Sequence, residues 1–280
     1  MTTSRRQIRA VARLDLAEVL RSRWLAMSAA GYALLAIVMI AVGQSEAPLL
    51  GFTGSSRVVF SLAHALVLVV PLIALTATAP AIGRSRDDGS LELLFAQPLS
   101  RTSYLIAITL VRGLAIVVPI ALVLVAVAAW GTVAYGQSVP WAYLGRALAI
   151  IAALAWAFTG IGMLVSTVVR HPVRMLTCIV VIWAAAVVLV DAALIGVLLH
   201  WRLEPHVVFG LAAINPVEDA RLALLSGVEP DLATLGPVGF RLAQQVGDGG
   251  LYLLGIAAPL AWGTLAWLVA LLHFRRADIA

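Results

Sequence analysis

Six long apolar stretches constrain this chain more than any other feature. They cover residues 24–42, 58–82, 113–135, 147–169, 175–199 and 251–274. A helix rises about 1.5 Å per residue, so about 20 residues cross the roughly 30 Å hydrocarbon core of a bilayer. Each stretch is long enough for that, and the pattern predicts six transmembrane helices.

The composition excludes an ordinary soluble domain. Hydrophobic residues make up 62% of the 280 residues, charged residues only 12%, and the mean hydropathy is +1.02. A soluble domain is about half apolar and about a quarter charged. The sequence therefore predicts an all-α polytopic membrane protein, with residues 1–280 forming a single transmembrane domain whose main contact is the lipid bilayer.

The arginines predict the orientation of the chain. All 19 basic residues are arginine, and 14 of them fall before the first stretch, in the loop after the second, in the turn after the fourth, or at the C-terminus. Cytoplasmic segments carry such an excess, so both termini are expected in the cytoplasm. Because this rule accounts for the net charge of +5, we expect no nucleic-acid partner.

Several kinds of chemistry are missing from the sequence. A Walker A loop needs a lysine, and the chain has none, so it is not its own ATPase. The single Cys178 and the five histidines lack metal-ligand spacing, and no metal site is predicted. No nucleophile elbow or zinc-protease motif is present either, which disfavours a membrane enzyme.

Residues 5–23 have apolar residues at helical spacing among six arginines. This pattern predicts that segment 1–23 is an interfacial helix on the membrane surface, with an apolar face formed by the following residues: Ile8, Val11, Ala12, Leu16, Val19 and Leu20. A charged tail that only sets the topology is the alternative.

The cytoplasmic loop 83–112 contains a second helix signal. Ser90 is a candidate N-cap for a short helix over residues 91–96, with Glu92 in its first turn, where the helix dipole favours an acid. Pro98 ends that helix, and Ser100 can cap the helix that returns to the membrane. The result is a short apolar-faced helix below the membrane, on which a soluble motor could push, or else an ordinary connector.

The run Asp88-Gly-Ser-Leu-Glu92-Leu-Leu-Phe-Ala-Gln-Pro98-Leu-Ser-Arg101 resembles the signature after the second span in ABC-2 type permeases, and Phe274-Arg-Arg-Ala-Asp278 resembles their C-terminus. The resemblance implies a permease in a bacterial inner membrane, paired with a second copy of itself and with a separate ABC ATPase that binds ATP and Mg. The positions that match the family are Asp88, Gly89, Glu92, Pro98 and Arg101, and together with Asp87 and Leu94 we assign them to coupling with that ATPase.

The outer segment 200–250 is too long for a simple connector. Asn215 is a candidate N-cap, Pro216 suits the first helical position, and Gly227 would end the helix. The family places short re-entrant or outer helices here, between spans five and six; a solvated amphipathic helix is the alternative. We assign an outer gate or contact with an extracytoplasmic accessory protein to Asn215, Pro216, Glu218, Asp219, Arg221, Pro237 and Phe240.

This outer segment and the chain length also resemble the branch of the family that serves copper-site maturation of nitrous oxide reductase. The sequence therefore predicts ATP-driven export or an extracytoplasmic assembly task. The alternative is an ion-coupled secondary transporter, which needs internal repeats and carboxylates near the membrane midplane. We find no repeat, and Asp191 is the one candidate carboxylate; His64 is the other polar group within a span.

Overall fold

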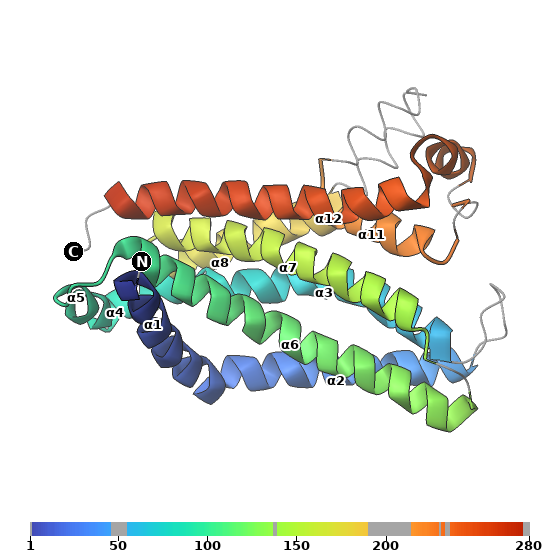
Figure 1. Ribbon diagram of the computed structural model, residues 1–280, viewed down its shortest axis with the longest axis horizontal. Coiled ribbons are helices and arrows are strands. Elements are labelled where there is room, and N and C mark those ends of the chain that lie inside the picture. Colours follow the sequence, from blue (N-terminus) through green and yellow to red (C-terminus); the bar gives the residue numbers. More distant parts are fainter. Residues whose placement is uncertain are drawn as a thin grey trace.

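The computed structural model describes residues 2–45, 55–136, 139–189, 214–229, 231–232 and 236–276. Every regular element in these ranges is a helix. Most of the helices run side by side along the long axis of the molecule (Figure 1). The predicted all-α class is therefore confirmed.

Five helices are long and apolar enough to cross a membrane. Their bounds are α2 Arg23–Ser45, α3 Ser55–Thr78, α6 Arg101–Tyr135, α7 Trp141–Val168 and α12 Gly236–Arg276. The predicted fifth span corresponds to α8 (Pro172–Ala184), which continues as a π-helical turn, η1 (Ala185–Leu189). The rest of that predicted span, including Asp191, lies outside the described residues.

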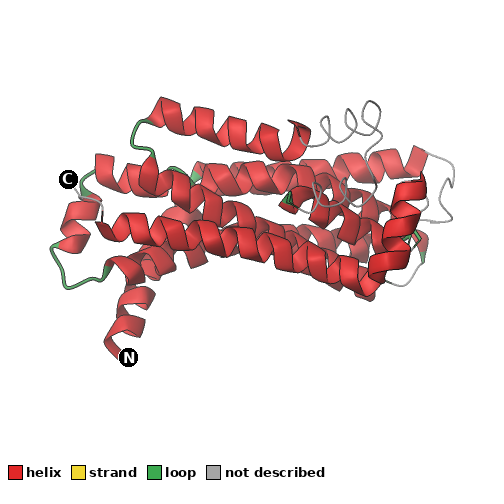
Figure 2. Cartoon of the chain, turned by 90° about the horizontal axis from the view of Figure 1, so that it is seen from above, coloured by secondary structure: helices red, strands yellow, loops and turns green. Residues whose placement is uncertain are grey.

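The predicted N-terminal helix is α1 (Thr2–Arg21). It lies across the end of the bundle, and its N-terminus projects to one side (Figure 2). The face that it buries differs from the predicted stripe: Val11, Asp15 and Val19 are buried, whereas Leu16 and Leu20 are exposed. Positions 11, 15 and 19 are four residues apart, so they share one face of the helix.

The predicted loop 83–112 is mostly helical, and its boundaries were wrong. Helix α3 is followed almost at once by α4 (Ala81–Asp87) and α5 (Ser90–Phe95), and α6 already begins at Arg101. The first turns of α6 are amphipathic: Tyr104, Leu105 and Ile108 are buried. The apolar stretch 113–135 therefore begins 12 residues after the helix does, whereas the predicted cap at Ser100 matches the observed start.

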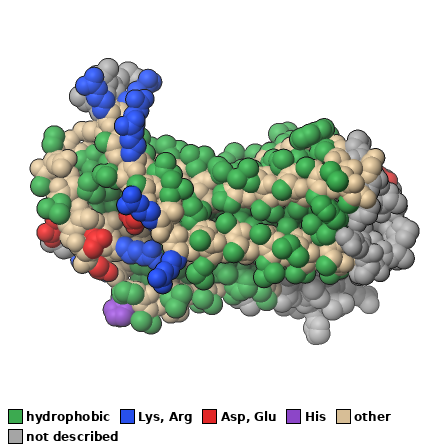
Figure 3. All heavy atoms as spheres, turned by 90° about the horizontal axis from the view of Figure 1, so that it is seen from below, with side chains coloured by type: hydrophobic (Ala, Val, Ile, Leu, Met, Phe, Trp, Pro, Cys, Tyr) green, Lys and Arg blue, Asp and Glu red, His purple; other side chains and the backbone are tan. Residues whose placement is uncertain are grey.

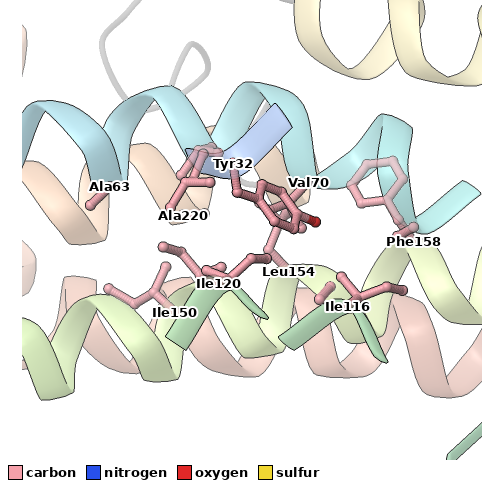
Figure 4. Packing of buried hydrophobic residues seen from close by; sticks show 14 of the residues in the cluster. Tyr32, Ala63, Val70, Ile116, Ile120, Ile150, Leu154, Phe158 and Ala220 are labelled. Atoms are coloured by element: carbon pink, nitrogen blue, oxygen red, sulfur yellow. The ribbon is translucent and has the colours of Figure 1, made fainter. Parts of the chain in front are cut away.

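The main core joins α2, α3, α6, α7, α8 and α11 (Pro216–Ser226). Figure 4 shows part of it, with Tyr32 of α2, Ile116 of α6 and Leu154 of α7 meeting from three different helices. Helices α7 and α12 approach so closely that a Cβ at Gly160 would lie 2.1 Å from the carbonyl oxygen of Gly263. Small residues allow membrane helices to pack backbone against backbone in this way.

Helix α12 bends at Gly247, where φ is 70° and ψ is 165°. A left-handed φ favours glycine because an L side chain would be strained there. The bend lies near the start of the long apolar stretch 243–276, after a first part that begins at Gly236. The predicted outer segment 200–250 therefore contains α11 and the start of α12.

Candidate functional site: the two ends of the helix bundle

At one end of the bundle, α5 is anchored by its apolar face. Leu91 is fully buried in a cluster with residues of α1, α4, α6, α7 and α12. Leu94 and Phe95 pack against the same cluster, as predicted for this helix. Phe95, Tyr104 and Phe274 form an aromatic group with ring centroids 5.4–6.1 Å apart. This packing holds α5 firmly below the bundle.

The opposite face of α5 points away from the protein. Glu92 is exposed, and the neighbouring Leu93 is 72% exposed. Asp87 and Asp88, at the end of α4, are exposed as well. The exposed Leu93 therefore lies near three acids, on a short helix whose opposite face is buried against the bundle. Such a surface can contact a soluble partner.

The turn before α5 differs in detail from the prediction. Gly89, not Ser90, occupies the N-cap position, with a left-handed φ of 72°. Ser90 is the first residue of the helix, and its backbone N–H donates to Asp88 Oδ1 at 2.9 Å. Hydrogen bonding to Ser90, from its side chain first and from its backbone N–H second, lowers the pKa of Asp88. The glycine of the motif therefore allows the chain to change direction between α4 and α5, since a left-handed φ favours glycine.

The two motif residues at the end of the loop have structural contacts. Arg101 donates from Nη1 to the carbonyl oxygens of Phe274 at 2.9 Å and Arg275 at 3.0 Å, so it caps the C-terminus of α12. The Pro98 carbonyl accepts from Gln7 Nε2 of α1. Ser100 caps α6 as predicted, because its hydroxyl accepts from the Ser103 N–H at 3.1 Å. The motif that ends at Arg101 and the C-terminal motif that begins at Phe274 are therefore in direct contact.

A buried ion pair, which the sequence analysis missed, connects α1 to this end of the bundle. Arg112 donates to Asp15 Oδ1 at 3.1 Å and to the carbonyl oxygen of Ala77 at 2.7 Å. The side chains are 8% and 7% exposed. Burial raises the pKa of Asp15, and Arg112 opposes that rise. The i, i+4 spacing of Asp15 with Val11 and Val19 is the signal that could have revealed it.

At the other end of the bundle, α11 begins as predicted. Asn215 Oδ1 accepts from the Val217 N–H at 3.0 Å, and Pro216 is the first helical residue. Asn215 Nδ2 also donates to the carbonyl oxygen of Ala186 in η1 at 2.7 Å. Gly227 takes the C-cap position. One face of α11 is buried against the bundle, so it is not a solvated helix.

The C-terminal end of α11 is held by Arg146 of α7. Its guanidinium donates to Ala223 O at 2.9 Å and to Ser226 Oγ at 2.7 Å, and pairs with both carboxylate oxygens of Asp248 at 2.6 and 3.0 Å. It also lies 4.9 Å from the centre of the Tyr252 ring. A cation is favourable beside the last carbonyls of a helix. No pattern in the sequence indicated this role for Arg146.

The acids of α11 differ in their surroundings. Glu218 pairs with Arg221 at 2.8 Å. Asp219 is 1% exposed, and neither of its carboxylate oxygens has a hydrogen-bond partner among the residues that the structure describes. Burial, together with the nearby Glu218, raises its pKa to about 8. Pro237 and Phe240 belong to the first part of α12, and their side chains lie outside the described part of the chain.

Long apolar helices side by side, with a helix across one end and a compact α4–α5 unit beneath it, define a polytopic membrane protein. The chain matches the ABC-2 family transporter proteins over residues 9–278 and belongs to that family, as a permease component of an ABC transporter. It is similar to two proteins named probable ABC transporter permease protein NosY. The one from Stutzerimonas stutzeri is 28% identical over 276 residues, which cover 96% of this chain and 98% of the relative. The one from Pseudomonas aeruginosa is 31% identical over 281 residues, with the same coverage.

Proposed function

We propose that this chain is the membrane subunit of an ATP-driven machine in a bacterial inner membrane, coupled to a separate ABC ATPase through α5. The anchored helix with its outward Glu92 and Leu93 is the observation that carries the proposal. Because the apolar face of α5 is packed against the bundle, a movement of α5 would displace the bundle, whereas a flexible loop could move without it. Arg101 and Arg112 extend this connection to α12, α1 and α3.

The arrangement requires a partner for ATP and Mg, because the chain has no lysine for a Walker A loop. Two copies of the chain with two ATPase subunits would form the functional unit, since closed two-fold symmetry is the commonest arrangement of such assemblies. The secondary-transporter alternative would need a carboxylate near the membrane midplane, and its candidate, Asp191, lies outside the described residues.

The test is to purify the tagged chain from membranes and to measure ATP hydrolysis by the subunit that accompanies it. We expect Glu92→Arg to uncouple or abolish hydrolysis that depends on the chain, because the reversed charge lies at the contact. Asp231→Arg, an equal charge reversal at the opposite end, should leave hydrolysis unchanged. Full activity in Glu92→Arg would mean that α5 is an ordinary connector.

We further propose that the machine serves copper-site maturation of nitrous oxide reductase, on the strength of the likeness to proteins named NosY. In that role, α11 would cover the outer mouth of the dimer, and the segment after it would contact an extracytoplasmic accessory protein. Expression of this chain with its own ATPase in a strain lacking NosY tests the idea. Restored copper loading of the reductase supports the role, and a copper-free reductase beside a stable complex contradicts it.

A further inference from the structure

A hollow of about 300 Å³ lies between α2 and α3. Its lining residues come from facing sides of the two helices: Trp24, Met27, Ser28, Gly31, Leu35, Val69 and Ile73. Helix α2 is the least covered of the spans, with 17% of its apolar window buried, against 67% for α7. The hollow therefore lies on a side of the molecule that the described residues leave largely uncovered.

The small side chains of α2 create this hollow. A Cβ added at Gly31 would meet no atom within 4 Å, and Ser28 lies one turn earlier on the same helix. The Ser28 hydroxyl donates to the carbonyl oxygen of Leu25 at 3.0 Å, so its polar group is already satisfied. The remaining lining is apolar or aromatic, and its natural occupant within a membrane is a hydrocarbon chain.

One end of the hollow leads to basic residues. Trp24 lines it and also lines a smaller neighbouring hollow, which Arg84, Ser22, Thr76 and Glu18 share. The Trp24 indole donates to Thr76 Oγ1 at 3.4 Å. Tryptophan is typical of the level of lipid headgroups, so this end of the hollow corresponds to the membrane surface.

Three exposed arginines flank that end: Arg21 and Arg23, on either side of the α1–α2 junction, and Arg84. Glu18 is the one acid that lines the smaller hollow, beside Arg84 and Arg112, and Arg112 is paired with Asp15. Figure 3 shows the wider pattern: arginines gather in a band near one end of a face that is otherwise largely hydrophobic. The local charge is positive and suits an anionic group.

We propose that the α2–α3 hollow binds an acyl chain of an anionic phospholipid, whose phosphate lies at Arg21, Arg23 and Arg84. The lipid would fill the space beside α2 and connect the α1–α2 junction to the start of α4. A second copy of the chain fits this face less well. Two-fold symmetry sets the same patch against itself, so these arginines would face one another, and like charges in an interface are costly.

The experiment is native mass spectrometry of the full-length chain in the complex extracted from membranes. After delipidation, the complex is incubated with phosphatidylglycerol, phosphatidylcholine, or glycerol phosphate as a headgroup without acyl chains. We expect retention of phosphatidylglycerol several-fold above phosphatidylcholine and no retention of glycerol phosphate. Retention of glycerol phosphate at the level of the lipid would overturn the acyl-chain site.

Two variants separate the parts of the site. Gly31→Leu fills the hollow and should abolish retention of both lipids, whereas Gly113→Leu, at another open helix position, should not.

Arg23→Gln with Arg84→Gln should remove the preference for phosphatidylglycerol, whereas Arg170→Gln with Arg174→Gln, two exposed arginines elsewhere, should keep it. Unchanged preference in the first arginine pair overturns the proposal even if Gly31→Leu fails to fold. Dissociation of the dimer in Gly31→Leu without loss of lipid would assign the hollow to a subunit interface instead.

Discussion

Two arginines of this chain, Arg112 and Arg146, contribute both to its charge pattern and to its packing. Arg112 and Arg146 count toward the charge pattern that orients a membrane protein, yet each is committed to named partners on two other elements. Arg112 and Asp15 are both nearly inaccessible. Removal of one partner of such a pair leaves a buried charge, at a cost of about 3–5 kcal/mol. Each arginine therefore connects helices within one end of the bundle: Arg112 connects α6 to α1 and α3, and Arg146 connects α7 to α11 and α12.

Asp219 gives a prediction about pH. Burial beside Glu218 raises its pKa in the folded chain to about 8, far above the ordinary value of 3.8 for an aspartate. The folded state therefore holds a proton that the unfolded state has released, and stability falls as pH rises toward 8. We expect Asp219→Asn to remove this dependence and to raise the melting temperature at pH 8 by several degrees, because about 1 kcal/mol corresponds to 2–4 °C in a chain of this size.

Melting curves of the purified complex between pH 6 and pH 9 provide the measurement. Asp231→Asn is the control, since Asp231 is exposed and should not change the pH dependence. If the melting temperature of the unchanged protein is flat over this range, Asp219 is not protonated in the folded chain.

At the scale of elements, α7 is the centre of the bundle. It packs against α3 through Gly162, where a Cβ would lie 1.9 Å from Thr78 Oγ1, and against α12 through Gly160 and Gly263. Trp156 Nε1 adds a hydrogen bond to Thr264 Oγ1 at 3.1 Å. Because the two backbones are in direct contact, we expect a displacement of α12 at its Arg276 end to move α7 as well.

Gly160→Ala tests this packing. The added methyl group would overlap the Gly263 carbonyl, so α7 and α12 would have to separate, and overpacking of this kind costs about 1–3 kcal/mol or more. Gly113→Ala adds the same methyl group where nothing lies within 4 Å, and should be neutral or slightly stabilising. A melting temperature for Gly160→Ala equal to that of Gly113→Ala would show that the contact is looser than described.

The sequence predicted those elements whose signal is local. Long apolar runs identify spanning helices, and the caps at Ser100 and Asn215 are local hydrogen bonds. The partners of Asp15 and Arg146 lie 77 to 102 positions away along the chain, so no local pattern could identify them. The contact of Arg101 with the end of α12 spans 173 residues and has no local signature. Motif residues could therefore be located, but their contacts could not.

At the scale of the whole molecule, the predicted orientation remains to be measured. In a Cys178→Ser background, Asp87→Cys and Asp231→Cys place one thiol at each end, since both aspartates are exposed. A membrane-impermeant maleimide should label position 231 in intact spheroplasts and position 87 only after lysis. Labelling of both positions from outside would contradict a cytoplasmic α4–α5 end.

The central claim is that a separate ATPase binds at α5, and a photo-crosslinker in place of Leu93 tests it most directly. Leu93 is 72% exposed on the outward face of α5, so its replacement leaves the buried anchor Leu91 intact. We predict a covalent adduct between position 93 and a subunit that carries a Walker A lysine, and none from the same crosslinker at position 231. An intact complex that forms the adduct from position 231 but not from position 93 would contradict the account.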